Sequence, residues 1–389
     1  MENFVYDIKT KAYFGKNQIE NLGQILEKYG KKVLFVYGQG SIKKNGIYDK
    51  IIEIAKENNL ELVEFSGVEP NPLLSTVKKG IELAKSQNVD CILAVGGGSA
   101  VDCAKAIGTG VKYNGDVWDF FCGKAAPKDS LPVVGIVTLA ASGTEMSPFS
   151  VLTNEETMEK YGMASDIIRL NEVILDPVYT FSVNAFHSAC GVADAMSHIM
   201  GGYFSNNNEY LQDRMCEAVL KTLIHFGPKI LENPKDYEAR AQIFWASTIA
   251  INRILNYGLK PAWYECHTMG QALSAKYNIT HGLSLTLVHP KWYEFCIKSG
   301  KTEKFVTFGR NVWGLDSDDE TVAKKSIEEL SKFFFDTLKL PKSLSEVIEN
   351  IDKADLKKIA ETTSKNYSSE NWYAPTKAED IEEIYNSIY

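Results

Sequence analysis

The stretch Val89-Asp-Cys-Ile-Leu-Ala-Val-Gly96-Gly97-Gly98-Ser99-Ala-Val-Asp102 decides the fold class, because it joins an apolar run to three glycines and then to a helix-like segment. A short apolar run bounded by glycine is typical of a buried strand. Glycines before a helix leave backbone N–H groups open at its positive end, which suits a pyrophosphate. Ser99 and Asp102 have capping-box spacing, so we expect Ser99 to be the N-cap. An ordinary tight turn stays open as the alternative, because this is not a Gly-x-Gly-x-x-Gly motif.

Short apolar runs and amphipathic stretches alternate around this segment, which is the pattern of a parallel sheet flanked by helices. We expect further strands at 33–37, 60–65, 132–138, 151–153 and 172–175, and helices at 47–58 and 73–87. Helical periodicity then takes over at 208–226, 237–255 and 321–338. The sequence therefore predicts two domains. Residues 1–180 form an α/β dinucleotide-binding domain, and residues 181–389 form an all-α metal- and substrate-binding domain.

Composition excludes several classes of partner. A chain of 389 residues is long for one compact core, which agrees with two domains. With 42 basic and 50 acidic residues and a net charge of -8, nothing favours a nucleic acid or an anionic membrane. Seven scattered cysteines without a Cys-x-x-Cys motif indicate reduced thiols. Without a signal-like start or an apolar run of about 18 residues, we expect a cytoplasmic protein.

Four side chains have the makeup of a complete ligand set for a divalent metal: Asp194, His198, His267 and His281. Asp194 and His198 are four residues apart, so in a helix both leave one face, one turn apart. His267 and His281 lie in later segments that can close on this pair. Alone, an Asp-x-x-x-His pair is usually a surface or capping pair, so the prediction depends on the set. Imidazole with carboxylate suits Fe²⁺, Zn²⁺, Co²⁺ or Ni²⁺ rather than Ca²⁺ or Mg²⁺.

The other three histidines, His187, His225 and His289, have no partner at ligand spacing, and we interpret them as structural.

Two more loops have the composition of cofactor-binding segments. Tyr37-Gly-Gln-Gly-Ser41-Ile-Lys43-Lys44 follows a predicted strand and lacks the acidic residue that would accept hydrogen bonds from a ribose 2′-hydroxyl. The two lysines favour NADP(H), although both can equally face solvent. Thr138-Leu-Ala-Ala-Ser142-Gly-Thr144-Glu ends another strand with small residues beside which a flat ring fits. A metal ion beside a nicotinamide would act as a Lewis acid on an alcohol or aldehyde oxygen.

Taken in order, Gly-Gly-Gly-Ser-Ala-Val-Asp-Cys-Ala-Lys105, the Ser-Gly-Thr-Glu loop, Asp194-x-x-x-His198, His267 and His281-Gly282 resemble the iron-containing (group III) alcohol dehydrogenases. The likeness covers nearly the whole chain and is greatest to the NADPH-dependent aldehyde reductases and butanol dehydrogenases of that family. It implies a dehydroquinate-synthase-like fold, one Fe²⁺ or Zn²⁺, and often a homodimer.

Carried over position by position, the resemblance implies that Asp194, His198, His267 and His281 are the catalytic metal ligands. It also implies contacts to NADP(H), or alternatively NAD(H), from Gly38, Ser41, Asn71, Gly97, Gly98, Ser99, Asp102, Thr138, Ser142, Thr144 and Lys160.

One position departs from the family. Many members have a second histidine four residues after the third ligand, which is often proposed to relay the substrate proton, and here that residue is Gln271. Because an amide is not a base near neutral pH, we expect the proton to pass through water, a ribose hydroxyl or another group. His187 is a remote candidate.

The leading hypothesis is therefore a metal-dependent alcohol dehydrogenase or aldehyde reductase that acts on short- to medium-chain aldehydes and primary alcohols, in the manner of butanol dehydrogenase. A lyase of the same fold, resembling dehydroquinate synthase, is one alternative. That reaction needs several basic groups, whereas the flanking residues Trp263, Tyr264, Met269 and Leu283 are apolar or aromatic. A non-catalytic metal- or nucleotide-binding protein is the other alternative.

Overall fold

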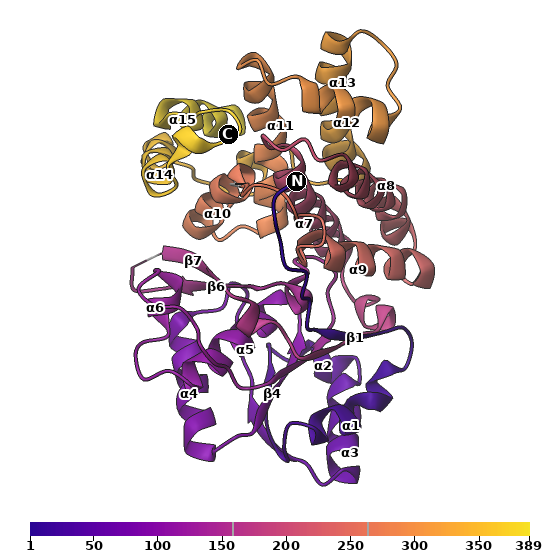
Figure 1. The fold of residues 1–389 in the computed structure, drawn as a ribbon, viewed down its shortest axis with the longest axis vertical. Coiled ribbons are helices and arrows are strands. Elements are labelled where there is room, and N and C mark those ends of the chain that lie inside the picture. The colour runs from indigo at the N-terminus through magenta and orange to yellow at the C-terminus, as the bar shows by residue number, and fades with distance from the viewer. Residues whose placement is uncertain (158, 263) are drawn as a thin grey trace. The chain divides into compact units, whose positions relative to one another are not determined.

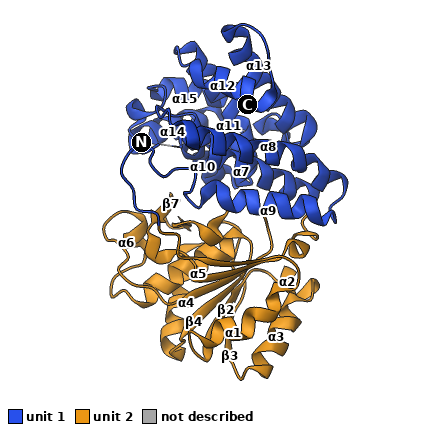
Figure 2. Ribbon diagram, turned by 45° about the vertical axis from the view of Figure 1, so that its right-hand side comes forward, with its two compact units in different colours: residues 1–6, 184–389 blue, residues 7–183 orange. Residues whose placement is uncertain are grey.

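The computed structural model describes residues 1–157, 159–262 and 264–389. These residues form two compact units (Figure 2), one spanning Asp7–Val183 and the other Asn184–Tyr389 together with Met1–Tyr6. The first residues join the second unit because the Glu2 amide donates to the Gly258 carbonyl at 2.8 Å. The division thus falls just beyond the predicted boundary at residue 180, and the amino terminus belongs with the later segment. Among the described residues, no helix is long and apolar enough to cross a membrane.

The first unit, coloured indigo to magenta in Figure 1, is built on a parallel sheet. The strand order of this sheet is β1-β8-β5-β4-β2-β3. Its strands are β1 (Lys11–Phe14), β2 (Lys32–Tyr37), β3 (Glu61–Phe65), β4 (Cys91–Gly96), β5 (Val133–Val137) and β8 (Glu172–Leu175). Its helices are α1 (Leu22–Glu27), α2 (Ser41–Lys44), α3 (Ile47–Glu57), α4 (Leu74–Gln87), α5 (Gly98–Val111) and α6 (Trp118–Phe121). The predicted α/β class of this segment is confirmed.

Both faces of the sheet are covered, which explains the nearly continuous apolar strands. Every residue of β4 and β5 is buried. On one face, side chains such as Phe35, Leu93 and Ile136 pack in one cluster with the apolar residues of α1 and α3. Helix α5 packs against β4 and β5, and α4 packs against α5.

The strand order creates a switch point between β2 and β4. From β2 the chain moves outward to β3, whereas from β4 it moves the opposite way to β5. In open α/β sheets, ligands bind beyond the carboxyl ends of the two strands at such a point. Two of the predicted cofactor loops follow β2 and β4, so they lie where the topology favours a dinucleotide.

Three local expectations were wrong. The segment 151–153 is not part of the main sheet: it lies in β6 (Phe149–Asn154), which pairs antiparallel with β7 (Glu159–Ala164). Strand β1 was not expected, because its four residues are partly exposed and have no apolar run. Ser99 is not the N-cap of α5. The cap is Gly97, without a side-chain hydrogen bond, and the Asp102 carboxylate accepts from Thr144 and Val151 instead.

In the second unit the described residues form helices and no strands, which confirms the predicted all-α class. The helices are α7 (Ala185–Tyr203), α8 (Tyr210–Glu232), α9 (Tyr237–Ile251), α10 (Glu265–Tyr277), α11 (His281–Lys298), α12 (Glu303–Trp313), α13 (Asp319–Lys332), α14 (Lys353–Asn366) and α15 (Ala378–Ser387). Helix α7 is the centre of this unit: nearly all of its residues from Ser188 onward are buried, and it packs against α8, α9, α10 and α11.

Candidate active site

Helix α7 presents the first two predicted metal ligands. The Asn184 side chain caps this helix by accepting from the His187 amide at 2.8 Å. Asp194 and His198 are separated by one helical turn, and both are buried. The imidazole Nε2 of His198 lies 3.7 Å from Oδ1 of Asp194.

The other two predicted ligands lie near the amino-terminal ends of α10 and α11. His267 is the third residue of α10, and His281 is the first residue of α11. Gly282 allows α11 to approach α7 closely, because a Cβ at that position would lie only 2.2 Å from the Cys190 carbonyl oxygen. Cys190 is one turn before Asp194, so this backbone contact sets His281 beside the carboxylate.

The four predicted ligands converge around one oxygen atom. Oδ1 of Asp194 lies 3.8 Å from Nε2 of His267 and 3.9 Å from Nε2 of His281. The ligand atoms of these three residues all lie within 4.8 Å of one another. The rings of His198 and His267 are stacked with centroids 4.6 Å apart.

Electrostatics also suit a cation at this position. Burial lowers the pKa of His198, against the opposing effect of Asp194, and burial holds the pKa of His267 well below its usual range. The imidazoles are therefore neutral, as metal ligands must be. Within the described part of the chain, Oδ1 of Asp194 and Nε2 of His267 are buried without a hydrogen-bond partner. Buried polar atoms of this kind are normally satisfied, so a divalent transition metal fits this donor set.

The glycine loop after β4 lies against the loop after β5. A Cβ at Gly98 would be 2.6 Å from Ser142 Oγ, so a larger residue would require the Ser142 side chain to move. The Thr138 amide donates to the Gly96 carbonyl at 2.9 Å, which joins the two strand ends. Gly97, Ser99 and Ser142 are all partly exposed. Five predicted cofactor residues, Gly97, Gly98, Ser99, Thr138 and Ser142, are thus brought to one edge of the sheet.

Lys105, to which the sequence analysis gave no role, holds the loop after β5 in place. Its ammonium is completely buried. It donates to the carbonyl oxygens of Thr144, Ser147 and Phe149 at 2.6, 3.0 and 2.7 Å. Thr144 in turn donates its hydroxyl to Asp102 at 2.5 Å. Burial lowers the pKa of Lys105 to about 8, although Asp102 and Glu145 oppose that shift. The signal for this role was a lysine in a helix whose residues are mostly small and apolar.

The loop after β2 contains Gly38 and Ser41, the predicted adenosine contacts. Gly40 has φ 107°, and Ser41 starts α2 and is exposed. The Lys43 ammonium lies 4.4 Å from the centroid of the Tyr48 ring. Tyr48 and Tyr37 both donate hydrogen bonds to Glu64, so Lys43, although exposed, lies beside an aromatic and acidic group. Lys44 is exposed.

Two predicted cofactor residues from distant segments meet directly: Nζ of Lys160, on β7, donates to Oδ1 of Asn71 at 2.8 Å. Asn71 has φ 55° and precedes α4. The spacing of these two residues in the sequence, 89 positions, did not predict that they meet.

The remaining residues raised by the sequence have varied surroundings. His187 and His225 are exposed. Gln271 is partly exposed and lies one turn after His267 on α10. Trp263 lies outside the described residues.

His289, which we interpreted as structural, is 2.5 Å from Ser197 Oγ, and Ser197 also contacts His267. The sequence analysis missed this connection, because its donor and acceptor come from different helices.

Comparison with known proteins agrees with this architecture. The family model "Iron-containing alcohol dehydrogenase" matches residues 9–177, and "Fe-containing alcohol dehydrogenase family, C-terminal" matches residues 188–389. The chain therefore belongs to the iron-containing alcohol dehydrogenase family. It is an NAD(P)-dependent oxidoreductase of the alcohol dehydrogenase class, and the family implies a divalent metal.

Among its relatives, NADH-dependent butanol dehydrogenase A of Clostridium acetobutylicum is 44% identical, with 100% of each chain covered. NADPH-dependent aldehyde reductase YqhD of Escherichia coli is 33% identical over 89% of each chain. The crystal structure of NADH-dependent butanol dehydrogenase A from Thermotoga maritima has a TM-score of 0.94 at 36% identity, covering 100% of this chain and 99% of that one.

Proposed function

We propose that this enzyme reduces short- to medium-chain aldehydes, and oxidises the corresponding primary alcohols, with NADP(H) as the hydride carrier. One Fe²⁺ or Zn²⁺ would be held by Asp194, His198, His267 and His281. The observation that carries the proposal is the convergence of three imidazoles on a buried carboxylate oxygen that has no hydrogen-bond partner in the described part of the chain. Relatives named butanol dehydrogenase and aldehyde reductase support the substrate class.

When bound, the metal would supply Lewis acidity toward the substrate oxygen. The protein contributes orientation and charge. The buried, neutral imidazoles of His198 and His267 keep their lone pairs available, and Asp194 supplies the negative charge of the ligand set. Holding reactants in a fixed geometry lowers the entropic part of the barrier to hydride transfer.

For the cofactor, we propose that the loops after β2, β4 and β5 bind the adenosine, pyrophosphate and nicotinamide ends in that order. Support comes from the switch point between β2 and β4 and from the glycines before α5. The absence of an acidic residue in Gly38–Lys44 favours NADP(H). The names of relatives differ on this point, since both NADH- and NADPH-dependent enzymes occur among them.

The substrate proton needs a route other than the side chain four residues after His267, where many family members have a histidine. Gln271 occupies the position one turn further on, and an amide neither donates nor removes a proton near neutral pH. We propose that the proton passes through water or a ribose hydroxyl of the cofactor.

We also propose a homodimer working in the cytoplasm, where its seven cysteines, all free thiols, stay reduced. Sedimentation at several protein concentrations tests the dimer.

The test of the main proposal is steady-state kinetics on an aldehyde series with NADPH and NADH side by side, using protein loaded with Fe²⁺ or Zn²⁺. The unaltered enzyme should oxidise NADPH when butanal is added. Asp194→Asn keeps the size of the side chain but removes its charge, so kcat/KM should fall at least about a hundredfold, or about 3 kcal/mol. His225→Ala is the control, because His225 is exposed and pairs with Lys229. Metal-loaded protein that turns over no aldehyde with either cofactor would refute the proposal and favour a non-catalytic binding protein.

A further inference from the structure

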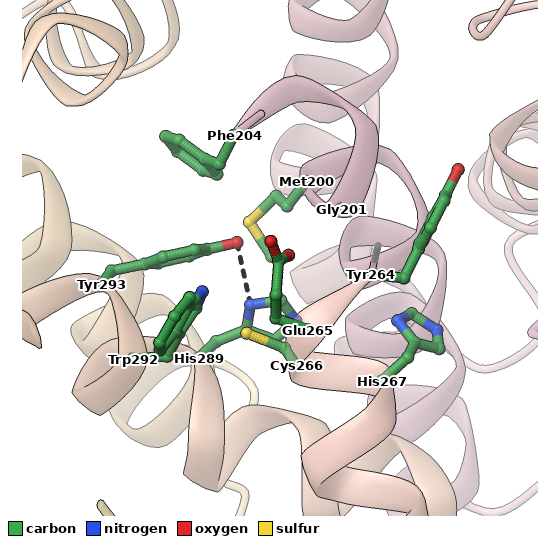
Figure 3. A pocket seen from close by; sticks show the side chains of 10 residues that line it. All are labelled: Met200, Gly201, Phe204, Tyr264, Glu265, Cys266, His267, His289, Trp292 and Tyr293. Carbon is green, nitrogen blue, oxygen red and sulfur yellow. Dashed lines mark hydrogen bonds between the residues drawn. The ribbon is translucent and has the colours of Figure 1, made fainter. Parts of the chain in front are cut away.

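A chain of buried hydrogen bonds leads away from the proposed metal site into the helical unit. Nδ1 of His267 lies 3.1 Å from Oγ of Ser197, and the same hydroxyl lies 2.5 Å from Nε2 of His289. Nδ1 of His289 then lies 2.9 Å from the Tyr293 hydroxyl, as the dashed line in Figure 3 shows. All four side chains are buried. His267, His289 and Tyr293 also line one small cavity with Glu265 and Trp292.

Three hydrogen bonds link these four groups, and the tautomer of each imidazole sets which atom donates. Two arrangements keep the single hydroxyl proton of Ser197 within the series. If His267 carries its proton on Nδ1, it donates to Ser197, Ser197 donates to Nε2 of His289, and His289 donates from Nδ1 to Tyr293. Ser197 and His289, the two middle groups, then each donate one hydrogen bond and accept one. In this arrangement Nε2 of His267 keeps its lone pair.

The reverse direction is also complete. Tyr293 donates to Nδ1 of His289, which donates from Nε2 to Ser197, and Ser197 donates to Nδ1 of His267. The proton of His267 is then on Nε2, the atom that lies 3.8 Å from Asp194 Oδ1. A nitrogen with a proton cannot bind a metal, so this direction inactivates His267 as a ligand.

We infer that Ser197, His289 and Tyr293 are positioning residues, which hold His267 with its proton on Nδ1 and the Nε2 lone pair directed at the metal. This inference rests on the metal site of the proposed function. A ligating histidine commonly donates its second ring N–H to a neighbouring acceptor, which sets its tautomer and orientation. Here the Ser197 hydroxyl is that acceptor, and the serine in turn donates a hydrogen bond to a second histidine, His289.

The surroundings of His289 support this role. Burial lowers the pKa of His289 to about 3, so its ring is neutral and has one N–H and one acceptor nitrogen. Only a neutral ring can accept at one nitrogen and donate at the other, which both directions of the chain require. The separation of the partners, 70 residues for Ser197 and His267 and 92 residues for Ser197 and His289, explains why spacing did not reveal them.

The first test measures Zn²⁺ affinity of the full chain by competition with a chromophoric chelator. Ser197→Ala removes the acceptor for His267 and should weaken Zn²⁺ binding about 10- to 100-fold. Ser197→Thr keeps the hydroxyl and should restore most of that loss. Ser326→Ala is the matched control, because Ser326 is equally buried in the same unit but donates only to the Ala323 carbonyl. Equal Zn²⁺ affinity of Ser197→Ala and the unaltered protein would overturn the inference.

The second test needs no substitution. Long-range ¹H–¹⁵N correlation spectra of the Zn²⁺ form, labelled at histidine, report which ring nitrogens carry protons. We expect protons on Nδ1 of both His267 and His289. A proton on Nε2 of His289, or Zn²⁺ bound through Nδ1 of His267, would overturn the inference while leaving the proposed function intact. If the unaltered protein binds no Zn²⁺, Fe²⁺ or Co²⁺, the inference and the proposed function both fail.

Discussion

Lys43 and Lys44 are adjacent residues with different surroundings. Both side chains are exposed, but the Lys43 ammonium lies over the Tyr48 ring and close to the Glu64 carboxylate, in the segment that we assign to the adenosine end. A charged hydrogen bond to a 2′-phosphate would therefore come from Lys44.

We predict that Lys44→Ala lowers kcat/KM for NADPH about tenfold, which corresponds to the ~1.5 kcal/mol of one charge-assisted hydrogen bond. The kcat/KM for NADH should stay within about twofold of that of the unaltered enzyme, because NADH has no 2′-phosphate. Parallel kinetics with the two cofactors make the comparison, and Lys50→Ala is the control, since Lys50 pairs with Glu53 on the surface of α3. An equal loss with both cofactors would contradict a phosphate contact.

Lys105 should make stability depend on pH in the alkaline range. Burial lowers its pKa from 10.5 to about 8 in the folded protein. Between these two values the unfolded chain holds the proton and the folded protein does not, so the free energy of unfolding rises with pH. This contribution is complete above pH 10.5 and is lost as the pH falls through 8.

We therefore predict that the difference in unfolding free energy between the unaltered protein and Lys105→Met grows by up to about 3 kcal/mol from pH 8 to pH 10.5. Denaturant titrations under reducing conditions at several pH values measure this difference. The contributions of the other titratable groups cancel, because both proteins contain them. A difference that is constant over this range would show that the Lys105 pKa is not lowered.

At the scale of the elements, we expect the contact of α11 with α7 to control the proposed metal site. The Gly282 position leaves no space for a methyl group, because the nearest atoms are the backbone of Cys190 rather than a movable side chain. Helix α11 must shift to admit a Cβ, and His281 is its first residue.

Gly282→Ala should thus destabilise the protein by roughly 1–3 kcal/mol and reduce its bound metal. Thermal unfolding of the metal-free protein and metal analysis after dialysis measure the two effects separately. Gly162→Ala serves for comparison, since a Cβ on that residue of β7 would make only ordinary contacts at 3.6 Å. Full metal content in Gly282→Ala would show that the close approach does not position His281.

The sequence predicted elements with a fully buried face better than partly exposed ones. Helix α4 was expected at 73–87 and lies at Leu74–Gln87, and β2 contains the predicted 33–37. Their apolar periodicity comes from faces that are buried along the whole element. The edge strand β1 and the hairpin of β6 and β7 are exposed on part of their surface, so their sequences have no comparable pattern.

For the whole molecule, the proposed metal ligands all lie in the helical unit and the proposed cofactor residues all lie in the α/β unit. Zn²⁺ should consequently slow amide hydrogen exchange in α7 and at the starts of α10 and α11. NADPH should slow exchange in the segments after β2, β4 and β5. Mass spectrometry of peptides from the intact enzyme resolves these regions, and metal-induced protection confined to residues 7–183 would contradict the assignment.

By itself, the sequence determined the fold class, the family and the identities of the four ligand candidates. Periodicity, glycine position and side-chain type are local properties that can be read without knowing what packs against what. Tertiary structure alone decided that three imidazoles surround one oxygen of Asp194, that Lys105 holds the Thr144 loop, and that His289 connects to His267 through Ser197. Apart from Asp194 and His198, which share α7, these contacts join groups from different elements, so they exist only once helices and strands are packed.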